Sequence, residues 1–177
     1  ISDSPRLDVE LLLANASGFD RTYLYTWPER ALSPQVAAQF EAKLARRIAG
    51  EPVAHIIGQR EFWSLPLMVD NTTLIPRPDT EILVDVALNA INQRGAIKCS
   101  SSPSKTAPRI LDLGTGTGAI ALALASELPH ACITAVDQSA QAVLLAKRNA
   151  CALGKNITVQ QGSWLDSAWQ TQMAQQP

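Results

Sequence analysis

The sequence predicts an α/β protein, in which a small helical domain and a hairpin-like connector precede a Rossmann-like domain. Short apolar segments alternate with longer helical patterns between residues 109 and 162, which is typical of strands in a parallel sheet with helical crossovers. A glycine-rich turn follows the first of these segments. Apolar side chains recur at helical spacing in the first 52 residues.

Residues 1–52 are predicted to form a small helical domain. In "SPRLDVELLLANASG", Pro5 suits the first helical position and Gly18 can end the helix. In "SPQVAAQFEAKLARRIAG", Ser33 can cap the helix and Gly50 can end it. Because this segment carries no glycine-rich turn and no acid at a strand end, we expect it to recognise a substrate rather than a cofactor.

Residues 53–77 are predicted to form a hairpin-like connector, because "EFWSLPLMVDNTTLI" alternates loosely and contains Asn71 as a turn residue. A helix is then expected to begin at Pro78, with acidic residues in its first turn. Residues 94–108, "RGAIKCSSSPSKTAP", are rich in Ser, Pro and Lys and predict a linker or loop.

Residues 78–177 are predicted to contain the amino-terminal part of the Rossmann-like domain. Three near-continuous apolar strands separated by two helices favour a parallel sheet covered on both faces. The ligand of such a sheet lies outside the carboxyl ends of the strands. The expected elements are a strand at 109–113, a helix at 118–128, a strand at 131–137, a helix at 139–154 and a strand at 156–162.

Composition and charge exclude several classes of protein. The 177 residues include 15 basic and 16 acidic side chains, so no strong field attracts the chain to nucleic acid or to an anionic membrane. The sequence has neither an apolar run long enough to span a membrane nor a signal-peptide pattern, and we expect a cytoplasmic protein. The three cysteines and two histidines lack the spacing of structural zinc sites, so we expect no metal.

The glycine-rich turn fits two cofactor fingerprints. The G-x-G-x-x-G/A pattern of dinucleotide-binding proteins is matched by Gly114, Gly116 and Ala119. The D-x-G-x-G-x-G pattern of S-adenosyl-L-methionine enzymes is matched by Asp112, Gly114, Gly116 and Gly118. The glycines alone do not decide between the two cofactors, because a glycine turn lets either ligand approach the backbone.

The charge of Asp112 favours S-adenosyl-L-methionine. A dinucleotide would place its pyrophosphate beside this carboxylate, and like charges about 4 Å apart repel by about 4 kcal/mol at an effective dielectric constant of 20. S-adenosyl-L-methionine instead carries an ammonium and a sulfonium. Asp137, at the end of the second strand, can accept hydrogen bonds from a ribose with either cofactor, and Trp164 can pack on the adenine. The structural alternatives are a helix cap for Asp112, a solvated strand end for Asp137 and a core or rim position for Trp164.

The chain resembles the release factor glutamine methyltransferase family of the HemK type over nearly its whole length. The resemblance lies in "EPVAHIIGQREFWSLPL", "TLIPRPDTE", "ILDLGTGTGAIALALA", "AVDQSAQAVLLAKRNA" and "QGSW". It implies that a small helical domain precedes a Rossmann-like catalytic domain, and that peptide chain release factors are methylated on the glutamine of their GGQ tripeptide. It also implies a donor site for S-adenosyl-L-methionine: Asp112, Gly114, Thr115, Gly116, Thr117 and Gly118 at the glycine turn, Asp137 at the ribose and Trp164 at the adenine.

One departure from the family concerns the acceptor site. The N-P-P-Y motif, which holds the acceptor amide in this family, does not occur in the sequence, so no catalytic residue is assigned. We therefore expect the 177 residues to be part of a longer protein and to be inactive alone. Three alternative functions remain open: an adenine-specific nucleic-acid methyltransferase, an NAD-dependent oxidoreductase and a non-catalytic donor-binding module. We expect release factors as partners, with no direct nucleic-acid or membrane contact.

Overall fold

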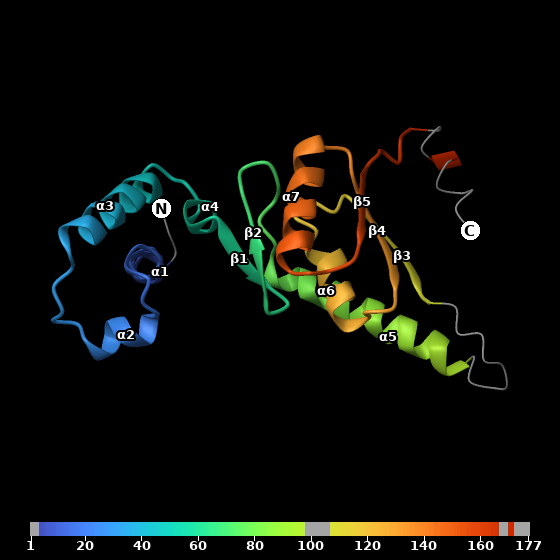
Figure 1. Cartoon of the computed structure of the whole chain (residues 1–177), viewed down its shortest axis with the longest axis horizontal. Coiled ribbons are helices and arrows are strands. Elements are labelled where there is room, and N and C mark those ends of the chain that lie inside the picture. The colour runs from blue at the N-terminus through green and yellow to red at the C-terminus, as the bar shows by residue number, and fades with distance from the viewer. Residues whose placement is uncertain (1–3, 98–106, 167–169, 172–177) are drawn as a thin grey trace. The chain divides into compact units, whose positions relative to one another are not determined.

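A computed structural model describes residues 4–97, 107–166 and 170–171 (Figure 1). The chain divides into two compact units, residues 1–59 and residues 60–177. Each unit has its own buried apolar side chains, and each is described by itself.

The described residues of the first unit form four helices: α1 (Pro5–Ser17), α2 (Arg21–Thr26), α3 (Pro34–Ile48) and α4 (Val53–Ile57). Helix α1 packs against the other three, and it contributes Leu12 and Ala16 to the buried side chains. As predicted, Gly18 ends α1 in the left-handed conformation and the Ser33 hydroxyl caps α3 by accepting the Val36 amide at 3.3 Å. The Asp20 carboxylate caps α2 through the Tyr23 amide at 2.7 Å.

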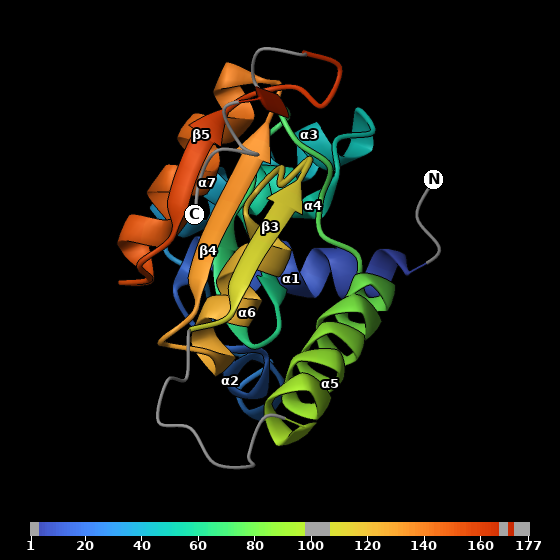
Figure 2. The ribbon, with the colours of Figure 1, turned by 90° about the vertical axis from the view of Figure 1, so that its right-hand side faces the viewer.

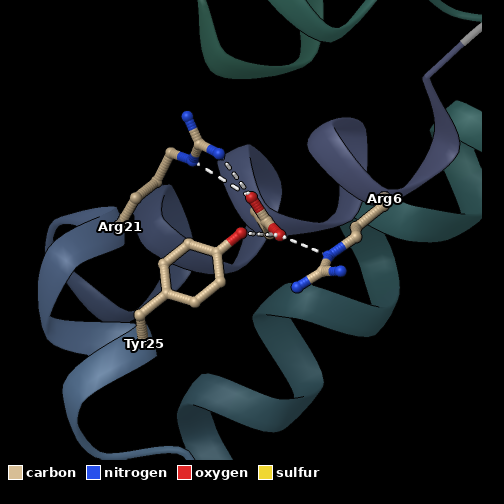
Figure 3. A network of polar contacts seen from close by, with 4 residues as sticks. Arg6, Arg21 and Tyr25 are labelled. Carbon is tan, nitrogen blue, oxygen red and sulfur yellow. Dashed lines mark hydrogen bonds and ion pairs between the residues drawn. The ribbon is translucent and has the colours of Figure 1, made fainter.

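A polar cluster joins α1 to α2 around the Glu10 carboxylate (Figure 3). This carboxylate accepts hydrogen bonds from the Tyr25 hydroxyl at 2.5 Å, the Arg21 guanidinium at 2.7 Å and the Arg6 guanidinium at 3.0 Å. The bond from Tyr25 is the main cause that lowers the pKa of Glu10 to about 2, followed by the bond from Arg21. The cluster therefore stabilises the ionised carboxylate.

The connector differs in part from its prediction. Residues 53–57, expected within the hairpin, form helix α4, which begins after Pro52 and ends at Gly58 in the left-handed conformation. A segment of five residues is too short to show a periodicity that separates a helix from a strand, so only the tertiary structure decides.

The hairpin itself consists of β1 (Gln59–Phe62) and β2 (Leu65–Met68). Its turn residues Trp63 and Ser64 have φ of 53° and 58°, as two-residue hairpin turns of the primed type require. Two hydrogen bonds fix this turn: the Trp63 amide donates to the Glu81 carboxylate at 2.9 Å, and the Trp63 indole donates to Glu127 at 2.8 Å.

Helix α5 (Glu81–Ile97) follows a single 3₁₀ turn, η1 (Pro78–Thr80), so the chain becomes helical at Pro78 as predicted. The helix packs against α6, and its Val84 side chain is completely buried. Because α5 continues to Ile97, residues 94–97 of the expected linker are helical. Most of the remaining linker, residues 98–106, lies outside the described residues.

The second unit contains every expected strand and helix of the Rossmann-like pattern. In chain order these are β3 (Arg109–Leu113), α6 (Ala119–Glu127), β4 (Cys132–Asp137), α7 (Ala140–Ala152) and β5 (Thr158–Gln161). The three strands are parallel in the order β3-β4-β5. The register places Asp112 of β3 beside Ala135 of β4, so the carboxyl ends of the strands lie at one edge of the sheet.

Helices α6 and α7 cover one face of this sheet (Figure 2). Residues Ile133, Ala135 and Val159 are buried within the apolar core that these helices contribute to. Leu111 and Leu113 of β3 point to the other face of the sheet, and they are 46% and 44% exposed. We expected helices on both faces of the sheet, but among the described residues they cover one face. The apolar sequence of β3 does not distinguish the two arrangements.

Candidate donor-binding site

The glycine turn between β3 and α6 has a backbone that only glycine adopts without strain. Gly114, Gly116 and Gly118 have φ of 76°, 56° and 83°, all in the left-handed region. The amides of Gly114 and Thr115 both donate to the Val136 carbonyl, at 2.8 and 3.0 Å. These bonds fold the turn over the end of β4 and bring it to the carboxyl edge of the sheet.

Asp137 connects three elements at this edge. Its Oδ2 atom accepts the Gly116 amide and its Oδ1 atom accepts the Ser139 amide, each at 2.9 Å. The end of β4 is thereby tied to the glycine turn and to the start of α7. A carboxylate offers about four acceptor positions, so Asp137 keeps the capacity to accept hydrogen bonds from a ligand.

Asp112 lies beneath the same turn in a partly buried environment. Its Oδ2 atom accepts the Thr115 hydroxyl at 2.7 Å. Burial is the main cause that raises the pKa of Asp112, and the negative charge of Asp137 also raises it, whereas hydrogen bonds from Thr115 and the Ala121 backbone lower it. The ionised Asp112 carboxylate therefore lacks part of its hydration, and a cationic ligand nearby would stabilise it.

The two threonines of the glycine turn point away from solvent. Thr115 is 7% exposed and Thr117 is 2% exposed. The Thr115 hydroxyl donates to Asp112, as described above. The Thr117 carbonyl accepts a hydrogen bond from the side-chain amide of Asn149 at 2.9 Å. The Thr115 side chain and the Thr117 carbonyl thus support the turn, and the Thr115 backbone is bonded to Val136 and Gly118.

Trp164, which follows β5, lies beside the glycine turn. A Cβ atom added at Gly114 would lie 3.8 Å from the Trp164 ring, and the tryptophan is 50% exposed. The structure therefore brings Asp112, Asp137, Trp164 and the glycine turn together at one edge of the sheet. Their roles toward a cofactor remain predictions.

Asn149, on α7, is a site residue that sequence reasoning missed. Its amide nitrogen donates to the carbonyls of Met68 and Thr117 at 3.0 and 2.9 Å, and its Oδ1 atom accepts the Met68 amide at 2.8 Å. The side chain is 1% exposed. The sequence does contain a signal for Asn149. It is a polar residue three positions after the apolar Ala146, which places it on the buried face of the helix, where a polar side chain needs hydrogen-bond partners.

Thr73 is the second missed residue, and it lies between the hairpin and α5. A Cβ atom added at Gly116 would lie 3.9 Å from the Thr73 Cβ atom. The Thr73 hydroxyl oxygen is buried and has no hydrogen-bond partner among the described residues. Such an orphaned buried hydroxyl is uncommon and often marks the position of a ligand or water.

The described ranges, 4–97, 107–166 and 170–171, contain no helix of the length and apolarity that crossing a membrane requires. They also contain no group of three or more His, Cys, Asp and Glu side chains placed to hold a metal ion. Cys132 and Cys151 are exposed free thiols.

Comparisons with known proteins match both units of the chain. Residues 2–58 match the family described as PrmC N-terminal domain, and residues 96–174 match the family described as Methyltransferase small domain. The chain is 51% identical to the release factor glutamine methyltransferase of Aliivibrio fischeri, over 93% of this chain and 54% of the relative. It is 50% identical to the enzyme of the same name from Escherichia coli K12, over 94% of this chain and 56% of the relative.

The chain thus spans about half the length of the curated relatives it matches. Among solved structures, a human methyltransferase 10 domain containing protein is similar at 22% identity and a TM-score of 0.46, over 78% of this chain and 57% of that chain.

Proposed function

We propose that the chain belongs to the release factor glutamine methyltransferase family and forms the donor-binding part of an enzyme that methylates peptide chain release factors, because it is about 50% identical to relatives of this name over most of its length. The methyl group comes from S-adenosyl-L-methionine, and the acceptor is the side-chain amide nitrogen of the glutamine in the GGQ tripeptide. The identity to relatives of this name supports the substrate, and the site at the edge of the sheet supports the donor.

The observation that carries the donor assignment is the Asp112 carboxylate beneath the glycine turn. Its partial burial favours a cationic ligand and disfavours a pyrophosphate. The positive φ at Gly114 and Gly116 lets a ligand approach the backbone closely, and the orphaned Thr73 hydroxyl offers a polar group that such a ligand could satisfy. These features fit S-adenosyl-L-methionine.

In the proposed complex, residues 114–118 hold the donor along the glycine turn and Asp112 faces its positive charge. The Asp137 carboxylate accepts hydrogen bonds from the ribose hydroxyls, while the Gly116 and Ser139 amides keep that carboxylate oriented. The half-exposed Trp164 ring covers the adenine. When bound, S-adenosyl-L-methionine supplies a methyl group activated by the sulfonium.

The acceptor amide must be positioned by other residues. An amide nitrogen is a weak nucleophile, so the rate depends on its alignment with the methyl group and on groups that accept hydrogen bonds from its N–H. The N-P-P-Y motif that serves this purpose in the family does not occur in these 177 residues. We therefore assign no catalytic residue here and propose that the 177 residues alone transfer no methyl group.

The helical domain, expected at residues 1–52, is proposed to recognise the release factor. Its α1–α2–α3 region exposes the aromatic side chains of Phe19, Tyr25 and Trp27, at 41%, 53% and 60%. Exposed aromatic residues are frequent anchors of protein interfaces. In a full-length protein, Trp27→Ala should raise the KM for the release factor and leave the KM for the donor unchanged. An equal rise of both KM values would contradict this role.

A cytoplasmic location and the absence of direct contact with nucleic acid complete the proposal. The near-neutral charge of the chain supports the second point.

Calorimetry tests the donor assignment directly. We expect S-adenosylhomocysteine, the product form of the donor, to bind at micromolar concentration, and NAD not to bind. Binding of NAD without binding of S-adenosylhomocysteine would instead support the oxidoreductase. For the acceptor, a full-length protein should methylate a GGQ-containing release factor and not an adenine-containing oligonucleotide; the reverse result would support the adenine methyltransferase.

A further inference from the structure

We propose that Thr73 is a donor-binding residue whose hydroxyl forms a hydrogen bond with the amino-acid end of the bound methyl donor. This inference rests on the proposed function and adds a residue to it. Thr73 precedes the helix that begins at Pro78, far in sequence from the glycine turn at residues 114–118.

The hydroxyl of Thr73 needs a partner. Its oxygen is buried from solvent and forms no hydrogen bond with the described residues. A buried hydroxyl without a partner opposes folding, because it loses its hydrogen bonds to water and gains none. The neighbouring Thr72 differs, since its amide and hydroxyl both donate to the Asp70 carboxylate, at 2.9 and 2.5 Å. Of these two adjacent threonines, Thr73 is thus the one left to bind a ligand.

The position of Thr73 is next to the glycine turn. A Cβ atom at Gly116 would contact the Thr73 side chain at 3.9 Å, which is an ordinary van der Waals distance. The Gly116 amide is bonded to Asp137, the proposed ribose ligand. A donor held by the turn and by Asp137 therefore lies close to Thr73.

Asn149 is the positioning residue that fixes this relationship. Its side-chain amide forms hydrogen bonds with the Met68 backbone and with the Thr117 carbonyl. The segment that leads from β2 to Thr73 is thereby held against the same turn that holds the donor. Because the Asn149 side chain is 1% exposed, water does not compete for these bonds.

The amino-acid end of the donor is the polar part that remains for Thr73. The adenine is assigned to Trp164 and the ribose to Asp137, which come from the ends of β5 and β4 in the sheet order β3-β4-β5. The carboxylate and ammonium of the donor then extend away from these two strands. A threonine hydroxyl can donate to a carboxylate or accept from an ammonium.

The test measures ligand binding by the whole chain with three variants. Thr73→Val removes the hydroxyl at nearly constant shape, Thr73→Ser keeps it, and Thr72→Val removes the neighbouring hydroxyl that serves Asp70. Each is titrated by calorimetry with S-adenosylhomocysteine and with methylthioadenosine, which lacks the amino-acid end. Thermal unfolding without ligand reports the structural effect of each substitution.

We expect Thr73→Val to weaken the binding of S-adenosylhomocysteine about tenfold and to change the binding of methylthioadenosine less than about twofold. The Tm of this variant without ligand should equal or exceed that of the unchanged chain, because an orphaned hydroxyl is removed. Thr73→Ser and Thr72→Val should bind S-adenosylhomocysteine normally.

Two results would overturn the inference while the proposed function stands. The first is a folded Thr73→Val variant with unchanged affinity for S-adenosylhomocysteine. The second is an equal loss of affinity for both ligands, which would place the hydroxyl elsewhere or show a general distortion of the site. If the unchanged chain binds neither ligand, the proposed function itself fails, and the inference fails with it.

Discussion

The Asp137 Oδ2 atom and the Gly116 amide nitrogen lie 2.9 Å apart and form a hydrogen bond between the end of β4 and the middle of the glycine turn. The same carboxylate accepts the Ser139 amide at the start of α7. A residue selected from the sequence as a ribose ligand is therefore also part of the structure of the turn. Substitutions at Asp137 consequently test binding and local structure together.

Asp137→Ala should weaken donor binding by about 1.5–3 kcal/mol, the range for losing a hydrogen bond to a charged group. Calorimetry with S-adenosylhomocysteine measures this loss, and circular dichroism verifies that the variant folds. Asp137→Asn is the matched control, because the side-chain oxygen of asparagine can still accept a hydrogen bond from one of the two backbone amides. It should bind more tightly than Asp137→Ala. Normal affinity in a folded Asp137→Ala variant would remove this residue from the site.

Asp112→Asn should stabilise the chain at pH 7 and weaken donor binding. The folded state raises the pKa of Asp112 above its ordinary value near 3.8, mainly through burial. The contribution of Asp112 to the free energy of unfolding is therefore fully present at a pH below this ordinary pKa. It is lost as the pH rises through the higher pKa of the folded state. The neutral asparagine avoids this loss and can still accept the Thr115 hydroxyl.

Thermal unfolding from pH 3 to pH 7 measures the effect of Asp112→Asn. Its Tm should exceed that of the unchanged chain at pH 7, and the difference should shrink at acid pH. The affinity for S-adenosylhomocysteine should fall about tenfold, because the ligand loses its carboxylate partner. A variant that binds normally would show that Asp112 only supports the turn.

Asn149→Ala should lower the free energy of unfolding by about 3 kcal/mol or more, because three hydrogen bonds are lost and buried backbone groups of Met68 and Thr117 remain unpaired. Denaturation by urea measures this change. Asn156→Ala is the control, because Asn156 is an exposed asparagine and its substitution should cost less than about 0.5 kcal/mol. Equal stability of the two variants would contradict the described bonds of Asn149.

Glu10→Gln should reduce the acid sensitivity of the helical unit. The folded state lowers the pKa of Glu10 to about 2, chiefly through Tyr25 and Arg21. The resulting stability is present above the ordinary value of 4.5 and is lost as the pH falls through that value toward about 2. Unfolding curves between pH 7 and pH 2 should therefore converge for the variant and the unchanged chain at the acid end.

The control for Glu10→Gln is Glu29→Gln, which replaces an exposed carboxylate of the same unit. The difference between this control and the unchanged chain should depend little on pH. Unfolding curves of Glu10→Gln that run parallel to those of the unchanged chain over the whole range would contradict the polar cluster around Glu10.

Local patterns sufficed for the order of elements in the Rossmann-like unit and for the core of its site. The alternation of strands and helices depends on side-chain periodicity within each segment, and the turn depends on glycines that alone adopt positive φ easily. Asp112 and Asp137 were found from their places at strand ends, and parallel pairing then brings those ends together. The short helix α4 was missed because its run of five residues, Val53–Ile57, carries no such periodicity.

The sequence by itself thus determined the fold class, the glycine turn and the acidic residues beside it, because each follows from interactions between near neighbours in the chain. Only the tertiary structure decided that Thr73 lies against Gly116 and that Asn149 ties the hairpin to the turn. Asn149 and Met68 are 81 positions apart, and no local pattern encodes which distant backbone groups a buried amide will meet. The packing of α7 against the hairpin strand β2 provides that information, since it brings these groups together away from water.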